Sequence, residues 1–308
     1  PGNQQYILFF AAGNDGGGNT DGSGGFAGSV GMPGNAKNVI TVGALEQYRR
    51  ADNLNVPPVD SVNRTDSDWE VADYSSRGPT PDGRTKPDVM APGSYVVSCQ
   101  SRDVNSDISA YPVGESWDYA FGNLDSGTNY AAESGTSMAT PLATGAGALI
   151  YQYFTNSFSK APTPAMMKAM MIAGAKNLHS WLYAWNEPRA TVYDGWGALN
   201  LARTIDGAMT YGSSEIINLD EDETTALATG NIYTYPGGYF VDAAAEGGLK
   251  VVIAWSDPPG TPGVGAVLVN DLDLVITAPN GAVFQGNSMS RSPGWGGRSY
   301  DVGAYVPL

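Results

Sequence analysis

Ser137 and Asn14 are the residues of this 308-residue chain whose types and surroundings best suit nucleophilic chemistry. Ser137 stands in "SGTSMATP", before a long run of small and apolar residues that predicts a buried helix. The free N–H groups and the dipole of a helix N-terminus favour negative charge, so a serine there is suited to attack a carbonyl and stabilise the resulting oxyanion. Gly135 permits a close approach, and Pro141 is tolerated in the early turns. The same small residues also suit close helix packing, so this segment alone leaves both interpretations open.

Asn14 follows a continuous apolar run, "YILFFAA" at residues 6–12, which is typical of a strand covered on both faces. In open parallel sheets, ligand sites gather at the carboxyl ends of the strands. An Asn side chain in that position can donate a hydrogen bond to an oxyanion, although Asn and Gly are also common in turns. Asn14 is therefore a candidate oxyanion donor.

The segments around these residues predict a parallel α/β domain. Residues 38–45, "NVITVGAL", form a second expected buried strand, and residues 163–175 predict a helix capped by Thr163 with Pro164 at its first position. A turn and a last helix are expected over residues 195–209. Three residues of the middle helix recur at helical spacing and are expected to pack in the core, namely Met167, Met170 and Met171.

Beyond residue 211 the pattern changes to short alternating segments, such as "LKVVIAWSD" and "AVLVNDLDLVITAPNG", separated by Pro and Gly turns. Such segments predict a small antiparallel sandwich or barrel, of the jelly-roll kind. We therefore expect two domains, over residues 1–211 and 212–308.

Composition narrows the classes of function. Apolar residues make up 42% of the chain and charged residues 15%, which is typical of a globular protein with a substantial core. The net charge of −15 argues against nucleic acid or an anionic membrane as the partner. No apolar stretch approaches the roughly 20 residues that a membrane span needs. The single cysteine, Cys99, excludes an internal disulfide and does not fix the compartment.

Six motifs in order give the chain a specific resemblance. They are similar to the second half of a subtilisin-like serine protease: "FFAAGNDGG", "GSVGMPG", "NVITVGA", "YSSRGPTPDGRTKPDVMAPG", "SGTSMATPLATGAGAL" and "GWGALNL". The downstream "VIAWSDPPG" and "LVNDLDLVITAPNG" resemble the β-barrel domain of the KP-43-like branch of alkaline subtilases.

This resemblance implies a secreted serine endopeptidase that acts on polypeptide substrates. It makes Ser137 the nucleophile, and it makes the Asn14 side chain and the Ser137 N–H the two donors of the oxyanion hole. It also implies a pocket for the residue before the scissile bond, whose small lining leaves room for a large apolar side chain. The expected lining residues are Ala11, Ala12, Gly13 and Gly31.

A structural calcium site is a further expectation. Asp271 and Asp273 of "NDLDL" share one face of a strand because side chains alternate, and two neighbouring carboxylates repel unless a cation lies between them. With Asp257 and Asn270 they offer hard oxygen ligands suited to Ca²⁺, and the resemblance implies calcium in this domain. The alternative is a solvated acidic face.

The chain departs from the family in one essential respect. The catalytic Asp and His motifs, which precede the Asn and Ser segments in subtilases, are absent, and the single histidine, His179, stands in an unrelated context. We therefore expect a C-terminal fragment, one piece of a nicked enzyme, or a non-catalytic structural or binding protein on a degenerate scaffold. The start at "PGNQQYILFF" favours a fragment, and the presence of both Ser137 and Asn14 disfavours the non-catalytic protein. The expected partner is an N-terminal complement that carries the missing Asp and His, without which this chain is inactive.

Overall fold

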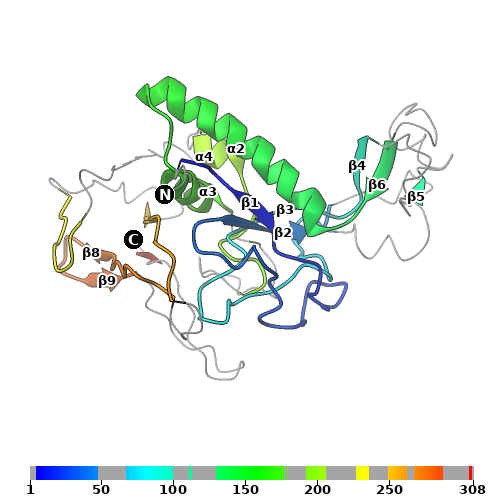
Figure 1. Cartoon of the computed structure of the whole chain (residues 1–308), viewed down its shortest axis with the longest axis horizontal. Coiled ribbons are helices and arrows are strands. Elements are labelled where there is room, and N and C mark those ends of the chain that lie inside the picture. Colours follow the sequence, from blue (N-terminus) through cyan, green and yellow to red (C-terminus); the bar gives the residue numbers. More distant parts are fainter. Residues whose placement is uncertain are drawn as a thin grey trace.

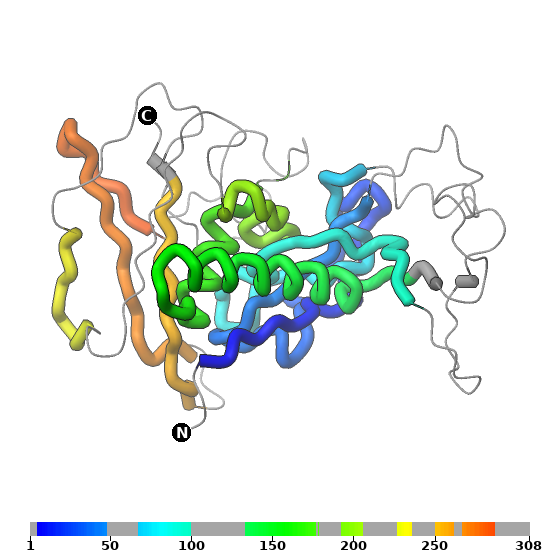
Figure 2. The backbone as a smooth tube through the Cα atoms, turned by 90° about the horizontal axis from the view of Figure 1, so that it is seen from above, coloured from blue at the N-terminus to red at the C-terminus, as the bar shows by residue number. Residues whose placement is uncertain are grey.

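The computed structural model describes residues 5–47, 67–99, 111–112, 130–176, 178, 192–205, 227–235, 249–261, 267–286 and 305–306. Figure 1 shows the central sheet beneath one long helix, with a smaller antiparallel sheet projecting at one end and the C-terminal strands at the other. Figure 2, turned by 90°, keeps the long helix α2 over the sheet and the C-terminal strands at the same end. None of the helices described here combines the length and the apolar character that a membrane span requires.

The central sheet is parallel, as expected for the α/β class. Its strands are β1 (Phe9–Ala11), β2 (Ile40–Leu45) and β3 (Val89–Pro92), in the order β1-β2-β3. The register pairs Ala11 with Val42, and Val42 with Val89. All six residues of β2 are buried, which confirms the strand expected over 38–45.

Strand β1 differs from its expected burial. All three of its residues are only half-buried, and Leu8 just before it has an exposed fraction of 47%. The reason is its place at the edge of the sheet, because among the described residues it pairs with β2 alone. The prediction that residues 6–12 form a strand covered on both faces is therefore wrong for this structure.

Helix α2 (Thr136–Phe158) confirms the helix expected from residue 136 onward. It packs across all three strands, and the residues it buries toward them in its first half are small, including Ala139, Ala143 and Gly147. A Cβ at Gly147 would lie 2.6 Å from the ring of Phe9, so this glycine lets the helix approach β1 closely. Ile150 and Phe154 continue the core from the second half of the helix.

Helices α3 (Pro164–Gly174) and α4 (Leu201–Ile205) complete the described helices. The Thr163 side chain accepts a hydrogen bond of 3.1 Å from the Met166 N–H, and Pro164 stands at the first position, which confirms the expected cap. The stripe expected in the core is buried, as the exposed fractions of Met167, Met170 and Met171 are 3% or less.

The remaining strands form small antiparallel sheets. Strands β4 (Val96–Cys99), β6 (Tyr130–Glu133) and β5 (Tyr111–Pro112) make the projecting sheet, in the order β4-β6-β5. In the C-terminal part, β7 (Leu249–Lys250) pairs with β10 (Tyr305–Val306), and β8 (Val275–Thr277) pairs with β9 (Val283–Gln285). The expected boundary at residue 211 lies outside the described residues, so the closed sandwich and the division at 211 stay predictions.

The close approach of α3 and α4 gives a testable expectation. A Cβ added at Gly174 would lie 2.8 Å from the Cα of Thr204, a buried residue. Gly174→Ala should therefore lower the free energy of unfolding, by roughly 1–3 kcal/mol for overpacking. Gly145→Ala is the matched control, because a Cβ there meets nothing within 4 Å, and it should stabilise α2 by about 0.5–1 kcal/mol. Urea unfolding measures both, and a shift of the same sign and size in the two variants would contradict the packing described here.

Candidate active site

Ser137 is the second residue of α2, and its side chain is exposed. The first turn of a helix leaves its N–H groups without helical acceptors. Here the Thr136 N–H donates to Asn14, whereas the N–H groups of Met138 and Ala139 donate to the carbonyl of Gly135 at 3.0 and 3.3 Å. Within the described part of the chain, the Ser137 N–H has no such acceptor. It is therefore available to a ligand placed next to the Ser137 hydroxyl.

Asn14 lies just beyond the carboxyl end of β1, beside the start of α2. Its Oδ1 accepts two hydrogen bonds from Thr136, one from the N–H and one from the hydroxyl, both of 2.9 Å. Because Oδ1 is bound in this way, the amide presents its Nδ2 on the other side. A Cβ at Gly135 would lie 3.4 Å from Nδ2, so the donor faces the turn that leads into Ser137.

Thr136 orients Asn14 in the candidate site, although its sequence context did not single it out. Its side chain is 1% exposed, and its hydroxyl accepts the Gly13 N–H at 3.2 Å while donating to Asn14. One side chain thus joins the segment of Asn14 to the first residue of the helix. A hydroxyl residue directly before Ser137 was the available signal, because a Thr hydroxyl can donate one hydrogen bond and accept others.

The four expected pocket residues lie together at the carboxyl end of β1. The carbonyl of Ala12 accepts a hydrogen bond of 2.9 Å from the Gly31 N–H, which places Gly31 beside the Ala11–Gly13 segment. Next to this segment, an open groove of about 450 Å³ runs between β1 and the first turns of α2. Its lining is Phe9, Phe10, Ala11, Ser137, Thr140, Pro141 and Thr144. Ser137 therefore opens into a groove rather than into the packed core.

The turn before Ser137 is held by Gly93, the residue that follows β3. The Gly135 N–H donates to the carbonyl of Gly93 at 2.9 Å, and the hydroxyl of Tyr74 donates to the same carbonyl at 2.8 Å. A Cβ at Gly93 would lie 2.6 Å from the Cβ of Ala44, so only glycine permits this approach of the three segments. The backbone that carries Ser137 is thereby held against the sheet.

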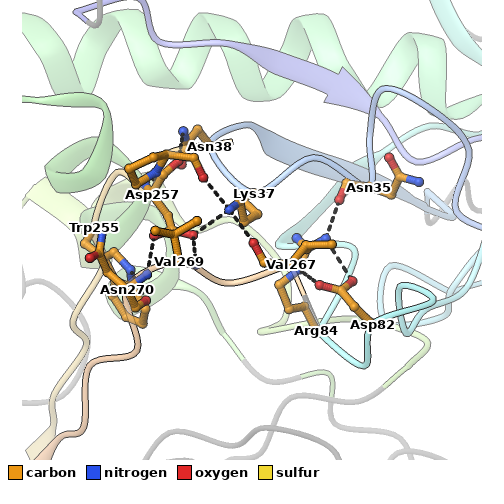
Figure 3. A network of polar contacts seen from close by, with 11 residues as sticks. Asn35, Lys37, Asn38, Asp82, Arg84, Trp255, Asp257, Val267, Val269 and Asn270 are labelled. Carbon is orange, nitrogen blue, oxygen red and sulfur yellow. Dashed lines mark hydrogen bonds and ion pairs between the residues drawn. The ribbon is translucent and has the colours of Figure 1, made fainter. Parts of the chain in front are cut away.

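The residues expected to bind calcium are arranged differently from the expectation. Figure 3 shows the Lys37 ammonium inserted among three oxygens of the C-terminal segment. Lys37 Nζ lies 2.5 Å from Asp257 Oδ2, 2.6 Å from the carbonyl of Pro258 and 2.7 Å from that of Val267. The N–H groups of Val269 and Asn270 donate to the same carboxylate at 2.9 and 2.8 Å. The cation beside Asp257 is thus an ammonium group of this chain.

The other expected ligands point elsewhere. Asp271 and Asp273 are exposed while Leu272 and Leu274 are half-buried, which confirms the expected alternation of the two faces. Across the described ranges, no group of three or more His, Cys, Asp or Glu side chains could hold a metal ion. Calcium binding stays a prediction, and this arrangement gives it no support.

Comparison with known proteins gives this geometry a family. Residues 2–197 match the Subtilase family, Peptidase S8. The chain belongs to the subtilase family. Its sequence is 31% identical over 280 residues to the serine protease/ABC transporter B family protein tagD of Dictyostelium discoideum. This match covers 77% of this chain and 14% of tagD. It is 32% identical over 179 residues to the serine protease AprX of Bacillus subtilis (strain 168). That match covers 58% of this chain and 32% of AprX.

This subtilase chain thus spans less than a third of the length of either curated relative. Among solved structures, it aligns with the prenylagaramide maturation protease PagA at 18% identity and a TM-score of 0.41, over 66% of this chain and 50% of PagA. That similarity is too low to carry an argument about function.

The single histidine of the sequence, His179, lies outside the described residues.

The ion pair at Asp257 predicts a pH dependence. Burial raises the pKa of Asp257, but the hydrogen bonds from Lys37 and from the N–H groups of Val269 and Asn270 outweigh burial and hold the pKa below its usual value. The carboxylate therefore contributes stability that is complete above that value and lost as the pH falls through the lowered pKa. Asp257→Asn should lower the free energy of unfolding at pH 7 by roughly 1.5–3 kcal/mol and weaken the loss at acid pH.

Urea unfolding between pH 3 and pH 7 measures this effect. Asp271→Asn is the matched control, since Asp271 is exposed and lies in the same segment, and it should follow the wild-type curve. An Asp257→Asn variant whose stability falls with acid as steeply as that of the wild type would contradict the assignment.

Proposed function

We propose that this chain is the Ser- and Asn-bearing part of a secreted serine endopeptidase. In the complete enzyme, Ser137 Oγ attacks the carbonyl carbon of a peptide bond, and the carbonyl oxygen becomes an oxyanion. The Ser137 N–H and Asn14 Nδ2 donate hydrogen bonds to this oxygen. The observation that carries the proposal is the orientation of Asn14: Thr136 binds its Oδ1 at 2.9 Å, so its donor faces the turn before Ser137.

The proton of Ser137 goes to a histidine that another polypeptide segment supplies, with an aspartate beside it. The subtilase family uses such a pair, and the one histidine of this sequence, His179, stands outside any motif of that kind. The site as described is suited to stabilise charge, and it needs this partner to move the proton. Ser137 alone is therefore a weak nucleophile, because a serine hydroxyl needs an adjacent base.

The surface around the groove supports such a complement. Within the part of the chain that the structure describes, β1 is an edge strand, and an edge offers free N–H and C=O groups to a further strand. On the solvent side of α2, Leu142 and Leu149 have exposed fractions of 46% and 50%, and Leu8 is exposed beside β1. These leucines do not line the groove itself, but exposed apolar residues on α2 and beside β1 are typical of an interface. We propose that the polypeptide carrying the catalytic His and Asp binds along the edge of β1 and over the exposed face of α2.

Substrate preference follows from the proposed pocket. The segment Ala11–Gly13 and Gly31 carry minimal side chains, and the groove beside them has mostly apolar lining. We propose a large apolar or aromatic residue before the scissile bond. The finer placement in the KP-43-like branch belongs to the same proposal and rests on the "VIAWSDPPG" and "LVNDLDLVITAPNG" segments.

The competing function is a structural or binding protein on a degenerate subtilase scaffold. Such a protein would need the packing of α2 on the sheet, but it would not need an exposed Ser137 or an amide donor oriented toward it. The pair of Thr136 hydrogen bonds to Asn14 favours the enzyme.

Labelling with a fluorophosphonate probe tests the nucleophile. This chain alone should remain unlabelled, whereas the complete protease, or this chain bound to the segment with the catalytic His and Asp, should be labelled at Ser137. Ser137→Ala should abolish labelling. Ser134→Ala is the matched control, a nearby exposed serine whose hydroxyl instead accepts the Tyr95 N–H, and it should retain labelling. Labelling that survives Ser137→Ala would refute the assignment.

Association with the complement is tested separately. Leu142→Asp together with Leu149→Asp places two charges in the proposed interface, and desolvating an unpaired charge is costly. This variant should bind the His- and Asp-bearing polypeptide at least roughly tenfold more weakly, as measured by calorimetry. Val275→Asp is the control on the C-terminal hairpin, where Val275 is 56% exposed. Equal affinities for both variants would place the complement elsewhere.

A further inference from the structure

Both neighbours of Asn14 in the chain are held by one buried residue, Ser76. The Ser76 N–H donates to the carbonyl of Gly13 at 2.9 Å, and the Asp15 N–H donates to Ser76 Oγ at 3.1 Å. Ser76 is completely buried. The main chain is thus bound immediately before and immediately after the residue that carries the proposed oxyanion donor.

This clamp requires a glycine on one side. Gly13 has φ +108°, a conformation that favours glycine, and a Cβ there would lie 2.9 Å from Ser76 Oγ. Because Gly13 has no side chain, Ser76 can pack directly against the backbone next to Asn14.

Ser76 itself belongs to a rigid segment. Beyond the clamp, the N–H groups of Gly16 and Gly18 donate to the carbonyls of Tyr74 and Asp73, both at 2.8 Å. The next residue, Arg77, is fully buried, and its guanidinium donates to the carbonyls of Gly24, Asp73, Ser75 and Gly22. The glycine-rich loop after Asn14 is thus wrapped around Arg77, and Ser76 is anchored with it.

Thr136 and Ser76 fix different parts of Asn14. Thr136 sets which way the amide points, because it binds Oδ1. Its hydroxyl also accepts the Gly13 N–H, whereas Ser76 accepts the Asp15 N–H on the other side of Asn14. There the chain enters a loop with Gly16, Gly17 and Gly18, residues that give the chain unusual freedom. An oxyanion donor must be held within roughly 0.5 Å of its productive position.

We propose that Ser76 is a positioning residue for the oxyanion hole, which acts by clamping the backbone on both sides of Asn14. This inference rests on the proposed protease function. It adds a residue from the segment before β3 that touches neither substrate nor Ser137. Loss of the Ser76 hydroxyl releases the Asp15 N–H and lets the Asn14 donor move from the oxyanion.

The test uses the complete protease, with its catalytic His and Asp, and four variants: Ser76→Ala, Ser75→Ala, Asn14→Ala and the double variant Ser76→Ala/Asn14→Ala. Ser75 is the matched control, since it is an equally buried serine whose hydroxyl accepts a backbone N–H, that of Ala44 at 3.0 Å. Ser76→Ala should lower kcat by between roughly 10-fold and 100-fold with KM unchanged, since a small misplacement of a catalytic group has effects of that size. Ser75→Ala should leave kcat within about twofold, the scatter expected without a transition-state role.

The double variant separates positioning from general destabilisation. If Ser76 acts through Asn14, its removal should have no further effect on kcat once Asn14 is alanine. Removing the corresponding donor in a subtilisin lowers kcat by roughly 10²–10³, which is the measured magnitude for that family. A Ser76→Ala effect that persists in full in the Asn14→Ala background would overturn the proposal, as would equal losses in Ser76→Ala and Ser75→Ala. Should Ser76→Ala not fold, Ser76→Cys, with a weak acceptor of similar size, is judged by the same criteria.

The two proposals fail in distinguishable ways. If Asn14→Ala itself leaves kcat unchanged, or Ser137 is not labelled by a fluorophosphonate, the protease assignment fails. If Asn14→Ala lowers kcat but Ser76→Ala does not, only the positioning role fails.

Discussion

The hydrogen bonds between Thr136 and Asn14 are the contact on which the described site depends. They join residues 122 positions apart, at the end of β1 and the start of α2. The same bonds satisfy the first N–H of the helix and orient the amide that faces Ser137. They can form only because Ala139, Ala143 and other small residues seat the helix closely on the sheet. The packing of α2 on the sheet therefore also determines the geometry of the site.

Buried charges tie the sheet to the surrounding segments. Asp88, just before β3, accepts the Thr41 N–H of β2 at 2.8 Å and forms ion pairs with Lys86 at 2.6 Å and Lys168 at 2.9 Å. Burial raises the pKa of Asp88, but the two ammonium groups outweigh it and keep the pKa below its usual value. Lys168 also donates to the carbonyl of Lys37, whose own ammonium binds Asp257. A continuous polar network thus runs from the strands through the segment after Gly31 to the C-terminal part.

The sequence pattern predicted the features that depend on residues close together in the chain. The apolar run of 38–45, the cap at Thr163 and the alternation around Asp271 and Asp273 were all predictable, because each depends on neighbours in sequence. The hydrogen bonds of Thr136 and Ser76 were not, because their partners lie 122 and 61 positions away. Asp257 was expected to share a calcium ion with Asn270, Asp271 and Asp273, but the cation beside it is Lys37, 220 residues distant. A sequence pattern can indicate that a side chain needs a partner, but only the fold shows which residue that partner is.

Under the proposed function, the described residues would meet one of the two demands of peptide hydrolysis. Stabilising an oxyanion needs fixed donors, and the Asn14 amide and the Ser137 N–H are held in place by Thr136 and the N-terminus of α2. Moving the proton would need a base beside Ser137, which lines an open groove between β1 and α2. Because the donors are already oriented, binding of a complement would not have to reorganise them. Its role would be to bring the base to Ser137, beside which the proposed oxyanion donors are already in place.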